Sequence, residues 1–271
     1  MKTVFVVIWI AMAAWLIRFE AFPGYFTRTL AGYEDIVARH VLISDQWMKV
    51  LYNGTPAGYS HTGMEFNEND PSRQHRIHSE FTALLPFSGN TVRIEAHGAV
   101  FLDALRDLQA FDFEVSFKGR SIRARGSRVA DETFDVAVNA LGSSNRATLT
   151  IPDNTIVYSP LSRMAIRNLK PGEHVKLRTL DPLSLETVTM TVRGLRAETI
   201  VVSGNSMRAT VLSCEYGGLS SLVWVGPDGR VIRQETPYGF TLEAATPEEA
   251  MNAFETATAS PSLPHAGGPG Q

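Results

Sequence analysis

The chain has only one cysteine, Cys214, among its 271 residues. A single thiol cannot form an intramolecular disulfide, so the fold must be stabilised by its packed core. The sequence also lacks the paired cysteines or the His-x-x-x-His spacing of a zinc site. His75 and His78 are three positions apart, which places them on opposite faces of a strand. We therefore predict that the chain binds no metal ion and no other cofactor.

Recognisable catalytic motifs are missing as well. The stretch 218–222 (GLSSL) lacks the closing glycine of a hydrolase nucleophile elbow. A thiol nucleophile needs a histidine base, and the histidine that follows Cys214 is His265, in a tail rich in proline and glycine. Cys214 alternates with Leu212 and Tyr216 in a predicted strand, as a buried core residue does. We predict that the protein is not an enzyme.

No large excess of charge of either sign is present. The formal net charge is −3, with 25 basic and 28 acidic residues. This balance argues against a nucleic-acid-binding protein that neutralises phosphates. The composition, with 44% hydrophobic and 20% charged residues, is that of an ordinary globular chain long enough for one large or two small domains.

Long hydrophobic runs are also scarce, with one exception at the N-terminus. Residues 4–17 carry no charge. At a rise of about 1.5 Å per residue they span roughly 21 Å as a helix, and Arg18, Phe19 and Phe22 can extend them towards the ~30 Å of a bilayer core. We predict a single-pass transmembrane anchor over residues 1–22 that meets the cytoplasmic membrane through residues 4–22, with the body of the protein in the periplasm.

A cleaved signal peptide and a buried helix are the alternative interpretations of the same segment. The cleavage site of a signal peptide should follow the apolar core, but Ala11-Met12-Ala13 lies inside that core, and residues 18–23 are bulky or charged. Positive charges flank both ends of the run, so charge alone does not decide the orientation.

Three further segments follow the anchor. Residues 23–46 form a neck with an amphipathic helix near residues 29–42, and residues 47–255 form a β domain. Residues 256–271 are rich in proline, glycine and serine, which predicts a disordered tail.

The β domain is predicted from an almost strict alternation of apolar and polar residues. In residues 91–102 and 111–117 every second residue is apolar. About a dozen such strands are joined by short turns, which favours antiparallel pairing. We predict a mainly β fold, a large curved antiparallel sheet (a half-open barrel) with one or two short helices. One of these helices, over residues 160–170 or near the C-terminus, should cover the concave side; a closed barrel or a two-sheet sandwich is the alternative.

Two local motifs support these boundaries. Asn53-Gly54 is a strong hairpin signal, although Pro56 favours a loop longer than two residues. Thr246-Pro247-Glu248-Glu249 is a capping box, which predicts a terminal helix that ends near Phe254.

The stretches 169–194, 198–214 and 220–239 resemble an exported bacterial domain of unknown function related to the lipoprotein-localisation (Lol-type) carrier superfamily. A G-x-x-x-G-Y hairpin at residues 54–59 and a W-x-x-x-D-G-x-x-x-R hairpin at residues 224–233 carry the likeness. It covers roughly residues 47–245 and is best over residues 169–243. The resemblance implies a curved sheet around an apolar hollow that binds a lipid or an acylated partner rather than catalysing a reaction.

Two groups of residues are therefore candidates for a site. Phe111, Phe113 and Trp224 are expected to line the hollow, with a role in the core as the alternative. A basic patch next to Lys118 is expected to meet anionic lipid head groups or a partner's carboxylates, or else to form a solvated edge; its members are Arg120, Arg123, Arg125 and Arg128. We expect a membrane-anchored, envelope-related domain that binds a lipid, another apolar ligand or a lipidated partner. The alternative is a scaffold for envelope assembly with a filled core.

Overall fold

The computed structural model describes residues 28–29, 33, 45–87, 90–140, 142–157 and 169–259. The predicted anchor, most of the neck helix, most of the predicted helix at 160–170 and the end of the tail lie outside these residues. Within the described residues, none of the helices combines the length and the apolar character needed to span a membrane.

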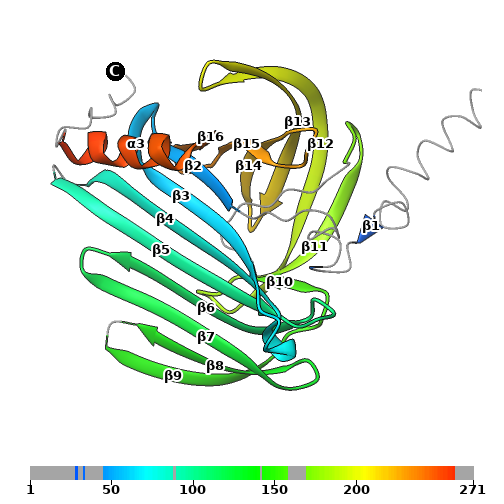
Figure 1. The fold of residues 1–271 in the computed structure, drawn as a ribbon. Helices are drawn as coiled ribbons and strands as arrows, with labels where there is room; N and C mark the ends of the chain where they lie inside the picture. The colour runs from blue at the N-terminus through cyan, green and yellow to red at the C-terminus, as the bar shows by residue number, and fades with distance from the viewer. Residues whose placement is uncertain are drawn as a thin grey trace, which may run out of the picture.

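The described strands form one large sheet (Figure 1). From one edge to the other, its strand order is β1-β11-β12-β13-β14-β15-β16-β2-β3-β4-β5-β6-β7-β8-β9, and β10 pairs with β11. A 3-10 turn (η3, Pro71–Arg73) and one helix (α3, Pro247–Ala259) complete the described elements. The strands are β1 (Arg28–Thr29), β2 (Asp45–Tyr52), β3 (Thr55–Phe66), β4 (His75–Phe87), β5 (Asn90–Leu102), β6 (Leu108–Phe117), β7 (Arg120–Ala130), β8 (Thr133–Ala140), β9 (Ser143–Thr150), β10 (Thr155–Val157), β11 (His174–Leu180), β12 (Thr187–Val202), β13 (Asn205–Tyr216), β14 (Leu219–Val225), β15 (Val231–Glu235) and β16 (Phe240–Ala245).

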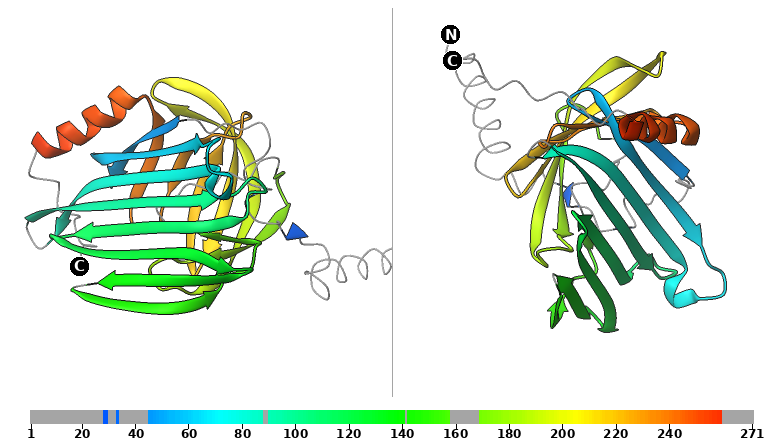
Figure 2. Two further views of the ribbon diagram at one scale, coloured as in Figure 1. Left: turned by 60° about the horizontal axis from the view of Figure 1, so that its bottom comes forward. Right: turned by 90° about the vertical axis from the view of Figure 1, so that its left-hand side faces the viewer.

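The sheet is not closed and folds into two facing wings (Figure 2). We call β2–β9 the first wing and β11–β16 the second wing; the pairing of β16 with β2 joins them. Neighbouring strands are antiparallel throughout both wings, and the two described parallel pairings are the short ones of β1 and β10 with β11. The prediction of a mainly β protein with a large antiparallel sheet is therefore confirmed.

Two-residue turns join several strands. Asn53 and Gly54 have φ angles of 49° and 82°, and Lys118 and Gly119 have 51° and 70°. Positive φ at both central positions is the signature of a type I′ turn, whose twist matches that of the strands. The longer loop predicted from Pro56 is wrong, because Pro56 pairs with Leu51 at a register shift inside the hairpin.

A second register shift lies within one long strand. The sequence pattern predicts separate strands over residues 186–193 and 198–203, and this is wrong, because residues 187–202 form the single strand β12. The shift lies between Gly194 and Arg196, where β12 pairs with β13. A Cβ at Gly194 would lie 2.2 Å from the Lys170 carbonyl oxygen, so the break in the apolar pattern marks a close approach of two backbones rather than a turn.

The main core lies between the two wings. We call the face of each strand that contributes to it the inner face. Alternate residues of the first wing, such as Phe81, Phe111 and Phe134, pack in one cluster with residues of the second wing such as Met190 and Leu242. Each of these five side chains is at most 2% exposed. Full burial of such a side chain contributes about 1.5–3 kcal/mol, so the facing of the wings holds the fold together.

Helix α3 covers the outer face of the first wing. The prediction that the C-terminal helix covers the concave side is therefore wrong, and its other form, with a helix over residues 160–170, falls mainly outside the described residues. The centre of the Phe254 ring lies 5.8 Å from that of the Tyr59 ring and 5.2 Å from the Arg93 guanidinium. Tyr59 and Arg93 alternate with inner-face residues of β3 and β5, which fixes the side on which the helix packs. The physical reason is that the second wing already occupies the space that faces the inner surface.

The ends of α3 test the capping prediction. The Thr246 hydroxyl accepts a hydrogen bond from the Glu249 amide at 3.2 Å, and the Thr246 amide donates to the Glu249 carboxylate at 2.9 Å, which confirms the capping box. The helix runs to Ala259, five residues beyond the expected end. Ala257 is 5% exposed, so the last turn is stabilised by packing that the tail composition does not reveal.

Candidate ligand-binding site

One end of the inner face of the first wing is completely packed. Leu102 at the end of β5 and Leu108 at the start of β6 are 0% and 1% exposed. Phe134 at the start of β8 and Ile151 after β9 are equally buried. These residues fill the space between the wings, so no ligand can enter at this end without displacing them. We call it the closed end.

Towards the Lys118–Gly119 turn the same face becomes accessible. Cross-strand partners on β5, β6 and β7 lie in one row there, namely Ala96, Val115 and Ile122. Ala96 and Val115 are half-buried, and Ile122 is 37% exposed. We call this apolar, partly uncovered region the open end; its residues are Ile94, Ala96, Val115, Phe117, Ile122 and Val138.

Phe111 and Phe113 separate the two ends, and two glycines seat their rings on the sheet. Phe113 stands opposite Gly98, and Phe111 stands opposite Gly126. A Cβ at Gly98 would lie 2.5 Å from the Phe113 ring, and one at Gly126 would lie 2.3 Å from the Phe111 ring. The rings therefore occupy the volume that larger residues would need, with 6.3 Å between their centroids. Of the pair, Phe113 is closer to the open end.

Trp224, the third predicted lining residue, lies elsewhere. It is 5% exposed and packs with Val211 and Ile232 in a second cluster, separate from the main core. Its Nε1 donates to Glu198 Oε1 at 2.5 Å, and the Arg233 guanidinium lies 5.4 Å from its ring. The structure does not bring Trp224 together with Phe111 and Phe113, because its neighbours Val223 and Val225 occupy the inner face at that point.

The predicted basic patch is divided between the two faces of β7. Arg123 and Arg125 lie on the outer face, where their side chains pair with acids of β6. Arg123 donates two hydrogen bonds to the Asp112 carboxylate, at 2.9 and 2.6 Å, and Arg125 donates one at 3.1 Å. Partial burial opposes ionisation of Asp112, but the two guanidinium groups outweigh it and lower the pKa of this carboxyl. These charges are neutralised within the sheet.

Arg128 is a structural clamp rather than a member of an accessible patch. Its guanidinium donates to the Leu108 carbonyl and to Asp153 Oδ1, both at 2.7 Å, and to the Asp131 carbonyl. It also lies 5.2 Å from the centre of the Phe134 ring. These contacts close the packed end of the inner face.

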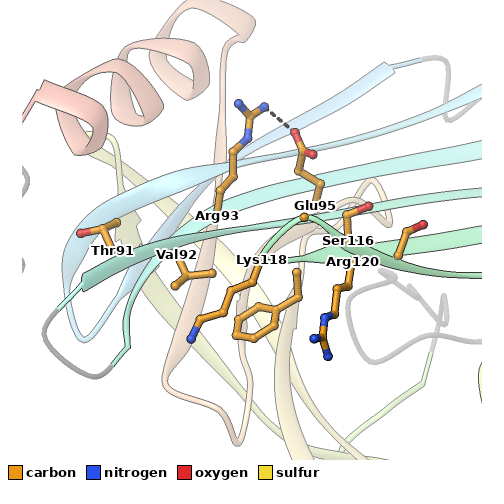
Figure 3. A pocket seen from close by; sticks show the side chains of 10 residues that line it. Thr91, Val92, Arg93, Glu95, Ser116, Lys118 and Arg120 are labelled. Atoms are coloured by element: carbon orange, nitrogen blue, oxygen red, sulfur yellow. Dashed lines mark ion pairs between the residues drawn. The ribbon is translucent and has the colours of Figure 1, made fainter. Parts of the chain in front are cut away.

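Arg120, the fourth arginine, has a different environment. It is exposed and begins β7 on the inner-face side, opposite Phe117. Together with Lys118 it borders a surface depression of about 520 Å³ at the β6–β7 turn (Figure 3). The apolar side chains of Val92 and Phe117 line the same depression. Sequence reasoning assigned neither Lys118 nor Phe117 to a site, although their position next to a Gly turn was visible.

The described histidines and Cys214 are the candidates for a metal site and a nucleophile. Within the described residues, no cluster of three or more potential ligands can hold a metal ion. His61 and His97 are both partners of Glu80 across the sheet, with one strand between them. Cys214 is 6% exposed, and burial raises the pKa of its thiol to about 12. A thiol in this state is a poor nucleophile.

Comparisons with known proteins give no family for this chain. No family model matches the sequence, and no curated protein matches it. Among solved structures, a DUF1089 family protein from Pseudomonas aeruginosa aligns over 68% of this chain and 92% of its own, with 14% sequence identity and a TM-score of 0.36. This likeness is too low to assign a fold family or a function. The relation to lipoprotein-localisation carriers therefore depends on the sequence motifs alone.

Proposed function

We propose that the protein binds a lipid, another apolar ligand or the acyl chain of a lipidated partner at the open end of its inner face, without catalysis. In this proposal it does so as a periplasmic domain anchored in the cytoplasmic membrane. The observation that carries the proposal is the gradient of burial along one apolar face. The closed end is filled by the protein's own side chains, while Ile122 and its neighbours leave apolar surface accessible.

The physical argument is that apolar surface gains free energy when an apolar ligand covers it. Removal of apolar area from water is worth about 25 cal/mol per Å², and the residues of the open end belong to four neighbouring strands, β5 to β8. Exposed apolar residues that form one continuous patch, rather than isolated positions, indicate a binding surface. Cys214, buried and protonated, supports the non-catalytic part of the proposal.

Photolabelling tests the proposal directly. The full chain, purified in maltoside micelles, is irradiated with a phospholipid that carries a diazirine on its acyl chain, and labelled peptides are mapped by mass spectrometry. We expect labels on β5, β6 and β7 at the open end. Ile122→Asp should lower them by about tenfold or more, since a carboxylate must be desolvated when an acyl chain covers it.

Asn139→Asp is the matched control, because Asn139 is exposed, lies on the outer face of the neighbouring strand β8 opposite Arg123, and does not line the depression. It should leave labelling of the open end unchanged. Equal labelling of the two variants, or the absence of any label from the open end of the unmodified chain, would reject the binding site.

A filled scaffold for envelope assembly is the second candidate, and the closed end favours it. Leu102 and Phe134 are so completely buried there that this part of the core has no room for a ligand. Strand β9 ends the sheet with a polar, exposed edge, to which another strand can be added. If photolabelling finds no lipid at the open end, this candidate gains support.

A further inference from the structure

The rim of the open end differs in charge from the rest of the apolar face. The residues that line the depression at the β6–β7 turn include three cations and one carboxylate (Figure 3). The carboxylate belongs to Glu95, which forms an ion pair with Arg93 at 2.5 Å on the outer side. The two other cations, Lys118 and Arg120, lie beside the apolar rows of the inner face.

The strand register places these two cations where the polar head group of a bound amphiphile would emerge from the apolar face. Phe117 pairs with both Ile94 and Arg120, so a charged residue directly follows the last apolar row of β6 and β7. Lys118 occupies the turn itself, and its ammonium group lies 5.7 Å from the centre of the Phe117 ring. Arg120 makes no ion pair with another residue of the described chain. Apolar surface therefore ends in positive charge within one hairpin.

We infer that the open end selects a phospholipid with an anionic head group, with the acyl chain on the apolar rows and the phosphate at Lys118 and Arg120. This inference rests on the proposed function and adds the class of ligand. Charge complementarity supports it, since an arginine guanidinium and a lysine ammonium bind phosphate oxygens through charge-assisted hydrogen bonds. Arg123 and Arg125, which already pair with Asp112, have no part in it.

The test compares two photoactivatable lipids that share the same diazirine acyl chain, phosphatidylglycerol and phosphatidylcholine, on the full chain in maltoside micelles. A cation near a lipid surface is worth about fivefold in affinity. We therefore expect phosphatidylglycerol to label the open end at least about fivefold more than phosphatidylcholine. NaCl at 0.5 M should reduce that preference, because it shortens the Debye length to about 4 Å.

The double variant Lys118→Gln/Arg120→Gln should abolish the preference for phosphatidylglycerol. Labelling by phosphatidylcholine, whose phosphate is balanced by its choline cation, should fall by less. Lys118→Arg/Arg120→Lys keeps both charges and should keep the preference. Arg125→Gln, an exposed arginine on the outer face of the same strand, is the matched control and should change neither lipid. The melting temperature of each variant verifies that it is folded.

The outcomes separate this inference from the proposed function. Equal labelling of the unmodified chain by both lipids, or a preference that survives in the glutamine double variant, overturns the head-group assignment and leaves apolar binding in place. Labelling of the open end by neither lipid overturns the proposed function and, with it, this inference. Loss of phosphatidylglycerol labelling in the presence of millimolar inorganic phosphate, with phosphatidylcholine unaffected, supports a phosphate subsite.

Discussion

Replacement of Arg128 by methionine tests whether the packed end of the inner face is held by this side chain. The Arg128 guanidinium joins three segments: the start of β6 at Leu108, the β7–β8 turn at Asp131, and Asp153 in the segment before β10. Its side chain is 15% exposed. Methionine keeps the aliphatic stem that packs on the core but removes every hydrogen-bond donor, so the decrease in stability measures the contribution of the polar contacts.

The magnitude follows from these contacts. Leu108 is 1% exposed, and removal of a charged donor from a carbonyl in such surroundings costs about 1–3 kcal/mol. The pair with Asp153, whose side chain is 52% exposed, adds at most about 1 kcal/mol. The contact with the Phe134 ring contributes about 0.5–1 kcal/mol. We expect Arg128→Met to lower the free energy of unfolding by roughly 2–4 kcal/mol, which corresponds to about 5–15 °C in melting temperature.

Thermal and urea unfolding followed by circular dichroism measures this difference. Arg125→Met is the matched control, because Arg125 is 53% exposed and shares its acid, Asp112, with Arg123. Arg125→Met should lower the free energy of unfolding by less than about 1 kcal/mol. If both variants unfold at the same temperature, or if Arg128→Met is as stable as the unmodified chain, then Arg128 belongs to a solvated edge. The basic patch would in that case have to be considered again as one surface.

Two further predictions concern the core. Burial raises the pKa of the Cys214 thiol to about 12, so this thiol should not react with Ellman's reagent at pH 8 until the chain is unfolded, and rapid reaction of the native thiol would contradict this prediction. Because the thiol of the unfolded chain has a pKa of about 8.5, the buried thiol's contribution to the free energy of unfolding is complete below that pH and is lost as the pH rises towards 12, and Cys214→Ala should flatten this alkaline decline. Gly126→Ala should lower the free energy of unfolding by about 1–3 kcal/mol, because the new methyl group would lie 2.3 Å from the buried Phe111 ring, and a melting temperature equal to that of the unmodified chain would show that the ring can move aside.

Much of the fold was predictable because it depends on local patterns. The alternation of residues 111–117 identifies their inner face, and the structure places Phe111 and Phe113 on it. The capping box at Thr246 and the hairpin at Asn53–Gly54 are properties of four adjacent residues or fewer, and both were recognised, although the length of the hairpin loop was not. Such signals need no knowledge of distant segments, which is why they transfer from sequence to structure.

Two groups of candidate site residues do not lie together in the structure, for two different reasons. Trp224 stands between Val223 and Val225, so both faces of β14 read as apolar, and only the placement of the second wing decides which one enters the main core. The basic run failed for a different reason. Its members alternate along β7, and parity alone separates Arg123 and Arg125 from Arg120 and Arg128. That signal was present in the sequence and was missed.

The hollow and the filled core need not be rival descriptions of this molecule, because they apply to opposite ends of one face. Two glycines set the boundary between the filled and the accessible part of the face. Gly98 and Gly126 let the rings of Phe113 and Phe111 rest against the sheet, and the space between these rings and the closed end is filled by buried side chains. Beyond Phe113, the row from Ala96 to Ile122 has nothing of comparable size. A ligand that binds there would lie on a floor made rigid by the packed core, and little of its binding energy would go into ordering the protein. The stability of the closed end and the affinity of the open end should therefore be coupled through Phe113, and a variant that loosens the first should weaken the second.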